Sequence, residues 1–157
     1  MNSTIRIGNC SGFYGDRLAA AKEMVEGGPI DVLTGDYLAE LTMKILYDQR
    51  EQRGSHLGYV GTFLKQLEDV IETFLDGNIK IVTNAGGLNP KGMADEVEKI
   101  LAEVGVDSKV AYIDGDNLLP DLSALQADGE KFTNLDTHVD LKDSTQEALT
   151  SNAFALV

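Results

Sequence analysis

The sequence has one cysteine, no tryptophan and no long apolar run. Its single thiol, Cys10, cannot form an internal disulfide or a cysteine-based zinc site. The first residues, MNSTIRIGN, lack the basic start and the apolar stretch of a secretory signal. No segment reaches the roughly 18 apolar residues of a membrane span. These absences predict a protein of the reducing cytoplasm without a membrane partner.

Basic residues are also scarce, since 13 Lys and Arg stand against 26 Asp and Glu, for a formal net charge of −13. So acidic a chain repels phosphate backbones, and we expect no nucleic-acid partner. A small anionic ligand, such as an acyl-CoA or a nucleotide, is still compatible with this charge, because a loop of backbone N–H groups creates a local positive field. The 157 residues suffice for a hydrophobic core, so we predict one domain over residues 1–157, less regular from 118 onward.

Four short runs rich in Ile and Val have the composition of buried strands. They cover residues 4–9, 30–34, 79–84 and 109–114. Helical periodicity covers residues 16–26, 36–50, 59–76 and 91–104. Strands that alternate with helices imply crossover connections. We therefore predict an α/β, Rossmann-like layered fold with a mainly parallel sheet flanked by helices.

The remaining stretches allow more than one interpretation. Residues 51–58, EQRGSHLG, are either an exposed lid or a plain connection between two helices. We expect a short helix over 120–127, an edge strand or an arm over 131–141, and a helical turn over 144–150. The last residues, SNAFALV, are apolar, which is typical of a terminus docked on a partner or of a chain cut from a longer one. We expect a homo-oligomer.

In open parallel sheets, ligands bind in the crevice at the carboxyl ends of the strands. Each predicted strand is followed by small polar residues and at least one glycine, so we expect the four loops to line one rim. The residues expected to bind a ligand there are Asn9, Ser11, Gly12, Tyr14, Gly15, Gly35, Gly86, Gly87, Asn89, Asp114 and Asp116. We expect Asp36, Asn84 and Asp16 to act as catalytic residues that orient or ionise the ligand.

The first of these loops contains Gly8, Gly12 and Gly15 in the spacing G-x3-G-x2-G, which is not the dinucleotide fingerprint G-x-G-x-x-G. The spacing is closer to that of short-chain dehydrogenases, whose NAG motif the residues 84–86 resemble. Asp36 could then take a ribose hydroxyl. Those enzymes need a Tyr-x-x-x-Lys pair, which this sequence lacks, so hydride transfer of that type is disfavoured. The loop is either a ligand cradle or a set of tight turns.

Other reactive residues have simpler interpretations. Asp114 and Asp116 flank a glycine and could hold a divalent cation, but such residues more often make turns, and we expect no metal. Cys10 has no histidine near it in sequence, because only His56 and His138 exist, which favours a small semi-buried thiol over a nucleophile. Lys91 either meets an anion or is a solvated surface lysine. The residues indicate no particular cofactor.

Several long segments together resemble one family, the acyclic terpene utilisation or AtuA-like proteins. These segments are GNCSGFYGDR (8–17), GGPIDVLTGDYLAELTM (27–43), VTNAGGLNPKG (82–92) and YIDGDNL (112–118), with NLDT (134–137) and LTSNAF (149–154) as later pieces. The resemblance implies a link to the breakdown of citronellol and geraniol through acyl-CoA intermediates, and in some members a fusion to an acyl-CoA carboxyltransferase-like domain. Because family members run to several hundred residues, we expect this chain to correspond to an N-terminal portion.

Three functions follow as hypotheses. The first is a catabolic enzyme, or its substrate-binding part, that acts on a small acyl or acyl-CoA compound in isoprenoid or branched-chain breakdown. The second is a nucleotide- or dinucleotide-binding module, which the glycine spacing and Asp36 favour. The third is a non-catalytic assembly subunit for an acyl-CoA carboxylase.

Overall fold

The computed structural model describes residues 4–107, 109–145, 148, 151–152 and 155–156. These residues divide into two compact units, Met1–Ile113 and Asp114–Val157. The expectation of a single domain over the whole chain stays a prediction.

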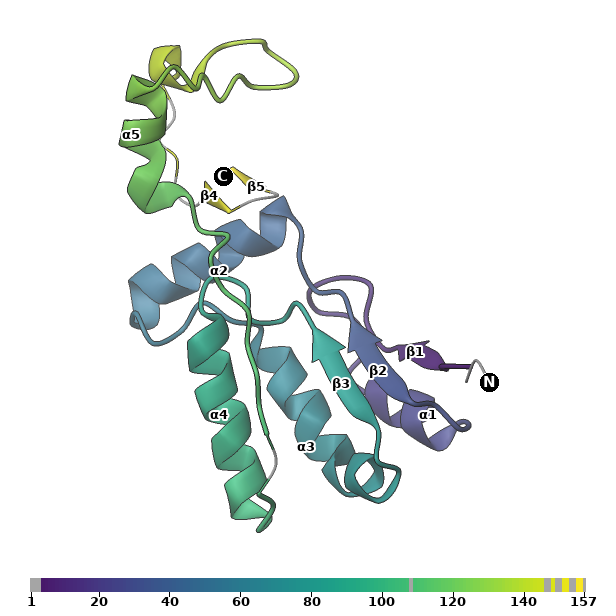
Figure 1. The fold of residues 1–157 in the computed structure, drawn as a ribbon. Coiled ribbons are helices and arrows are strands. Elements are labelled where there is room, and N and C mark those ends of the chain that lie inside the picture. The colour runs from purple at the N-terminus through teal and green to yellow at the C-terminus, as the bar shows by residue number, and fades with distance from the viewer. Residues whose placement is uncertain (1–3, 108, 146–147, 149–150, 153–154, 157) are drawn as a thin grey trace. The chain divides into compact units, whose positions relative to one another are not determined.

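A three-stranded parallel sheet forms the centre of the first unit (Figure 1). Strands β1 (Ile7–Asn9), β2 (Val32–Gly35) and β3 (Lys80–Thr83) lie in the order β1-β2-β3. Both neighbouring pairs are parallel, as crossover connections require. The predicted α/β layered fold with a parallel sheet is confirmed.

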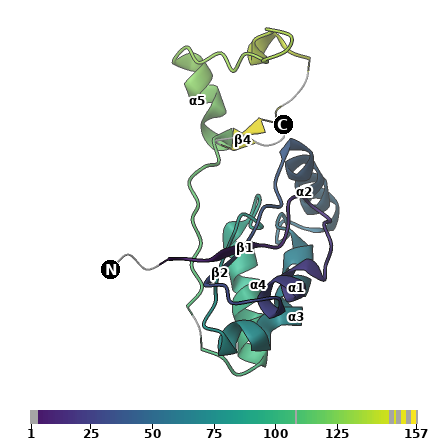
Figure 2. The ribbon, with the colours of Figure 1, turned by 90° about the vertical axis from the view of Figure 1, so that its right-hand side faces the viewer.

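Two helices, α1 (Ala20–Glu26) and α3 (Gly61–Asp76), cover the same face of the sheet (Figure 2). The connections from β1 to β2 and from β2 to β3 run in the same direction across the sheet. Because crossover connections share one handedness, their helices lie on the same side of the sheet. Helices α2 (Glu40–Arg53) and α4 (Pro90–Glu103) complete the unit. No helix in the described part of the chain is long and apolar enough to cross a membrane.

Helix α2 begins later than its periodicity predicts, because the residues before it are tied to other loops. The backbone N–H of Asp36 donates to the carbonyl of Ser11, at 3.0 Å. The next N–H, of Tyr37, donates to the side-chain oxygen of Asn84, at 2.9 Å. Ala39 is extended, with φ −155°, so the chain becomes helical only at Glu40.

Two clusters of buried side chains make up the core. One lies between α1, α3 and the sheet and contains Cys10, Ala21, Val25, Leu33, Val70 and Ile79. The other joins α2, α3, α4 and the loop after β3, and contains Tyr37, Leu46, Tyr59, Val60, Phe63, Leu67, Ala85 and Met93. Helix α3 contributes to both clusters, in agreement with its strong apolar stripe.

The other face of the sheet carries exposed apolar side chains beside polar ones. Ile7 and Val82 are 66% and 61% exposed, whereas Leu33, which points to the helices, is 2% exposed. The register places Ile7 beside Val32 and Val32 beside Lys80 across the three strands. Parallel sheets usually have both faces covered, so this exposed face is unusual for the class.

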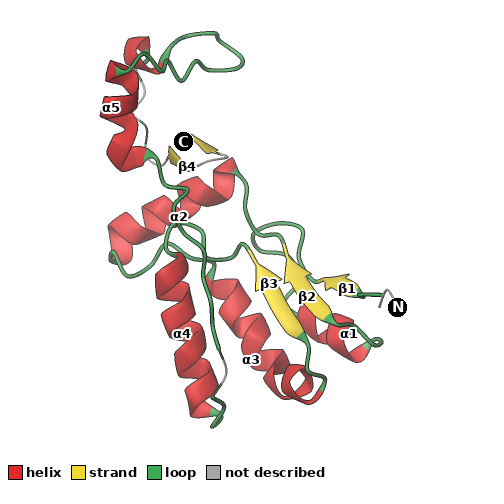
Figure 3. Ribbon diagram, in the orientation of Figure 1, coloured by secondary structure: helices red, strands yellow, loops and turns green. Residues whose placement is uncertain are grey.

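The predicted fourth strand, over residues 109–114, is wrong. The described residues contain no strand there, and Figure 3 draws the stretch as a loop. Tyr112 and Ile113 are 46% and 92% exposed, so this apolar run is not buried between layers. Its Ile and Val content matches that of a buried strand, but composition does not supply the neighbouring strand that pairing needs.

The second unit is built from short elements. They are the 3-10 helix η1 (Leu119–Asp121), helix α5 (Leu122–Ala127), the 3-10 helix η2 (Leu141–Asp143) and the strands β4 (Ser151–Asn152) and β5 (Ala155–Leu156), which pair in antiparallel. The helix expected over 120–127 is confirmed by η1 and α5.

Residues 131–141 form a closed loop rather than the edge strand that was one of their two interpretations. The backbone N–H of Asn134 donates to Val139 at 2.9 Å, and that of Leu141 donates to Lys131 at 3.1 Å. The helical turn expected over 144–150 falls largely outside the described residues.

The first prediction compares two leucines of helix α2. Leu46 is 0% exposed, and Leu41 is 71% exposed. Leu46→Ala removes buried methyl groups and leaves a cavity, so we expect the free energy of unfolding to fall by about 2–5 kcal/mol. Leu41→Ala, the same change on the surface of the same helix, should alter it by less than about 0.5 kcal/mol. Urea unfolding followed by circular dichroism measures both, and equal losses would contradict the assignment of the core.

Candidate functional site

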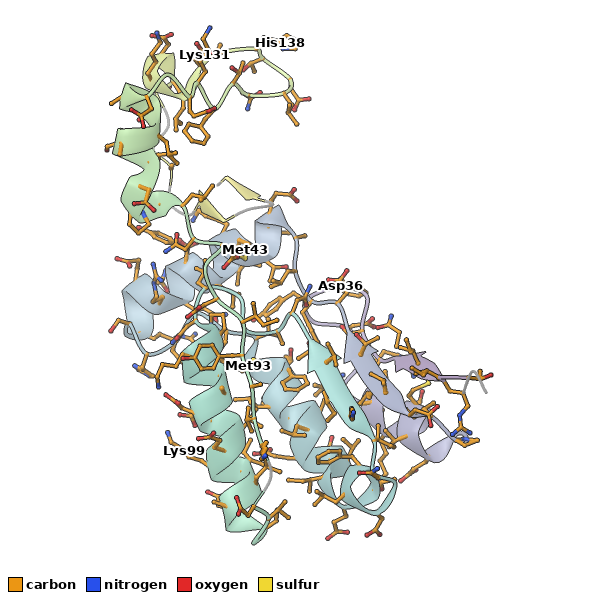
Figure 4. The ribbon with its side chains drawn as sticks, viewed as in Figure 1. Asp36, Met43, Met93, Lys99, Lys131 and His138 are labelled. Carbon is orange, nitrogen blue, oxygen red and sulfur yellow. The ribbon has the colours of Figure 1, made fainter. Side chains whose placement is uncertain are left out.

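The carboxyl ends of β1, β2 and β3 are joined into one polar rim. Figure 4 labels Asp36 at the end of β2. Its backbone N–H donates to Ser11 in the loop after β1, at 3.0 Å. Its carboxylate oxygen Oδ1 accepts from Nδ2 of Asn84, which follows β3, at 2.6 Å. The structure therefore brings together Ser11, Asp36 and Asn84, as the common edge of parallel strands requires.

Asn84 and Asp36 hold each other in place. Oδ1 of Asn84 accepts from the backbone N–H of Tyr37 at 2.9 Å, which leaves its Nδ2 pointing at Asp36. Oδ1 of Asp36 also accepts a longer bond from the N–H of Leu38, at 3.4 Å. Within the described residues no donor contacts Oδ2 of Asp36, an exposed side chain. This oxygen can accept a hydrogen bond or a proton from a ligand.

Asp16 closes the loop after β1 on itself. Its Oδ2 accepts from the N–H of Gly12 at 3.0 Å, and its Oδ1 accepts from the N–H of Arg17 at 2.7 Å. These backbone bonds, that of Gly12 first, hold the pKa of the Asp16 carboxyl below its usual range. The guanidinium of Arg17 turns to Glu23, with N–O distances of 3.0 and 2.6 Å.

A buried polar chain lies behind the rim. The hydroxyl of Tyr37 donates to Oε1 of Gln66 at 2.5 Å, and Nε2 of Gln66 donates to the carbonyl of Arg17 at 3.2 Å. Tyr37 and Gln66 are 1% and 2% exposed. Gln66 was not among the expected residues, although a glutamine within the apolar stripe of residues 59–76 signals a buried polar group. Such a residue has to find a polar partner in the core.

Cys10 is a buried thiol beside this chain. Its Sγ lies 3.9 Å from the hydroxyl of Tyr37, and burial raises the pKa of the thiol. Burial likewise raises the pKa of the Tyr37 hydroxyl. Both groups are therefore neutral at physiological pH, which agrees with the interpretation of Cys10 as a packing residue.

Asn89 anchors the connection between α2 and α3. Its Oδ1 accepts from the N–H of Gly92 at 2.9 Å and caps helix α4. Its Nδ2 donates to the carbonyls of His56 and Leu57, at 2.9 and 3.3 Å. Residues 51–58 are thus pinned to the loop after β3, which supports a plain connection rather than a lid.

Close contacts at Gly86 and Gly87 leave no room for a Cβ. A Cβ on Gly86 would lie 2.9 Å from Cα of Pro90. Gly87 has φ +53°, and a Cβ there would meet Leu46 and lie 2.8 Å from the carbonyl of Gly58. Gly12 differs, because the nearest atom to a Cβ there is Oδ2 of Asp16, at 4.0 Å. A ligand contact at each of these glycines stays a prediction.

Three of the other expected residues belong to β2 or to the loop after β1. Gly35 is buried against the ring of Tyr37, which would lie 2.7 Å from an added Cβ. The hydroxyl of Tyr14 bonds to Nε2 of Gln49 at 3.1 Å, and Gly15 turns the chain with φ +87°. Asp114 and Asp116 belong to the second unit, and a ligand contact at either residue stays a prediction.

Asn9 lines a separate pocket of about 330 Å³ beside β1, together with Met24, Pro29 and Ile30. This pocket was not predicted, because its walls also come from α1 and the turn before β2, and these separate segments meet only in the folded chain. Among the described residues, no group of three or more His, Cys, Asp or Glu side chains is arranged to hold a metal ion.

A parallel sheet with helices on one face and a hydrogen-bonded rim at the carboxyl ends of its strands defines an α/β protein of the Rossmann-like class. Within this class, the family model described as acyclic terpene utilisation family protein AtuA matches residues 5–155, and the chain belongs to this family. Comparison with curated proteins and with solved structures found no match. The match of the family model confirms the resemblance that the sequence segments predicted.

The second prediction separates two glycines of the rim. Gly12→Ala places its Cβ in ordinary van der Waals contact with Oδ2 of Asp16, so we expect the free energy of unfolding to change by less than about 1 kcal/mol. Gly86→Ala drives its Cβ into the backbone of Pro90 and should lower the free energy of unfolding by about 1–3 kcal/mol. Denaturant titration measures both values. If both variants lose the same stability, the packing reason for Gly86 is wrong.

Proposed function

We propose that this chain is a catabolic enzyme, or its substrate-binding part, that acts on a small acyl or acyl-CoA compound of isoprenoid or branched-chain breakdown. The observation that carries the proposal is the rim of Ser11, Asp36 and Asn84, whose hydrogen bonds join the ends of three parallel strands. This edge of an open parallel sheet is where ligands usually bind. Membership of the acyclic terpene utilisation family supports the substrate class.

A small acyl compound has a polar end and an apolar end, and the residues after β1, β2 and β3 offer groups for both. Oδ2 of the exposed Asp36 side chain is available to accept a hydrogen bond, or a proton from an acidic C–H or O–H group, while Asn84 fixes the carboxylate. Phe13 and Leu41, which are 60% and 71% exposed, belong to the segments that follow β1 and β2. Their side chains offer apolar surface for a hydrocarbon chain.

A nucleotide-binding module is the second candidate, and the position of Asp36 favours it. This residue directly follows β2 and contacts the loop after β1. In dinucleotide-binding folds, an acidic residue after the second strand takes the hydroxyls of a ribose. The two candidates differ in the ligand that they would place at the same carboxylate.

The third prediction tests both candidates by thermal unfolding. The panel is free CoA, short and isoprenoid acyl-CoAs, NAD(P), ATP and phosphate. A ligand at about a hundred times its dissociation constant stabilises by roughly 2.7 kcal/mol, which shifts Tm by several degrees in a small domain. We expect the acyl-CoAs to give this shift and Asp36→Ala to abolish it.

The control is Asp69→Ala, the same substitution at an exposed aspartate of helix α3, which should keep the full shift. A shift with NAD(P) or ATP alone would select the nucleotide-binding module. A chain that responds to no compound, or that responds equally in the Asp36→Ala variant, would contradict the assignment of the rim.

A further inference from the structure

We infer that the carboxylate of Asp16 occupies the anion position of the loop after β1, so that the rim selects against ligands whose anionic group would bind in this loop. The inference rests on the proposed function, because it concerns the selectivity of the same rim. It assigns Asp16 a role in specificity rather than in catalysis.

The geometry of the loop is that of an occupied anion site. The N–H groups of Gly12 and Arg17 converge on one carboxylate, one on each oxygen, at 3.0 and 2.7 Å. Convergent backbone N–H groups are the donors that proteins use to bind phosphate and carboxylate groups. Here those donors are bonded to a side chain of the loop itself, so an external anion would have to displace Asp16.

The loop is also open to solvent on the side of Gly12. This residue is exposed, and beyond its chain neighbours the only atom of the described structure within 4 Å of an added Cβ is Oδ2 of Asp16. A small anion could therefore reach the N–H of Gly12 once the carboxylate had left. Access is limited by the Asp16 side chain and not by packing.

The charges around the loop oppose an additional anion. Asp36 adds a second carboxylate to the rim, and its backbone is tied to Ser11, next to Gly12. The neighbouring cation, Arg17, is held by both carboxylate oxygens of Glu23. A phosphate that entered beside Asp16 would meet like charge, which disfavours its binding.

This selectivity separates the two candidate ligands. A nucleotide would place its phosphates in the loop after the first strand, where Asp16 is bonded. An acyl compound can instead present an uncharged carbonyl or hydroxyl group to Asp36 and Asn84 and leave the loop unchanged. The structure therefore favours ligands whose group at the rim is neutral.

The fourth prediction tests this role with inorganic phosphate as the probe. Asp16→Ala frees both N–H groups and removes a negative charge, so phosphate should bind at least on the order of tenfold more tightly to this variant than to the unchanged chain. Phosphate titrations followed by the amide resonances of residues 12 and 17 measure the affinity and locate the bound anion.

Two further variants make the result specific. Asp16→Asn keeps the shape of the side chain without its charge, so it should gain phosphate affinity by a smaller factor and guards against a misfolded alanine variant. Asp36→Ala removes the same charge from the rim without freeing the loop, so it should show no amide shifts at residues 12 and 17.

Tight phosphate binding to the loop of the unchanged chain would overturn the inference, as would the lack of any gain in both Asp16 variants. An equal gain in Asp36→Ala would also overturn it, because charge alone would then explain the effect. The phosphate titration and the test of the proposed function have separate readouts, so failure of one can be told from failure of the other. The acyl-CoA shifts of the unchanged chain test that function whether or not the Asp16 variants bind phosphate.

Discussion

The rim depends on two hydrogen bonds of the Asn84 side chain. This side chain accepts from the backbone N–H of Tyr37 and donates to the carboxylate of Asp36, so one amide joins the end of β3 to the segment after β2. The backbone N–H of Asp36 continues the connection to Ser11 after β1. These bonds replace the solvent contacts that exposed loop groups would otherwise make, and they give three separate loops one fixed arrangement.

Tyr37 connects the hydrogen bonds of the rim to the hydrophobic core. Its backbone belongs to the rim, whereas its ring is 1% exposed and packs edge-on against Phe63 of α3, with ring centroids 6.1 Å apart. Its hydroxyl reaches Gln66, which in turn holds the carbonyl of Arg17. Since a buried polar group without a partner is costly, this chain of bonds constrains the position of the loop after β1 from behind.

The same rim shows why net charge and local chemistry have to be considered separately. The chain carries a formal charge of −13, yet its first loop presents two converging N–H groups, a local feature that attracts anions. Asp16 satisfies these donors from within the loop. The rim consequently combines a carboxylate available to a ligand, on Asp36, with a carboxylate that is already committed, on Asp16.

Periodicity and composition by themselves determined the class of fold, three of the strands and the four helices of the first unit, because burial of one face imposes a pattern on adjacent residues. They also located Asp36 and Asn84, since the residues after parallel strands share one edge. Only the tertiary structure decided that residues 109–114 lack a strand partner, that Gly86 leaves no room for a Cβ and that Asn89 caps helix α4. It alone showed the contact of Gln66 with Tyr37 and the hydrogen bond from the backbone N–H of Gly12 to Asp16. These features depend on which groups meet across the fold, and a hydrogen bond or a close contact between distant residues leaves no periodic signal in the chain.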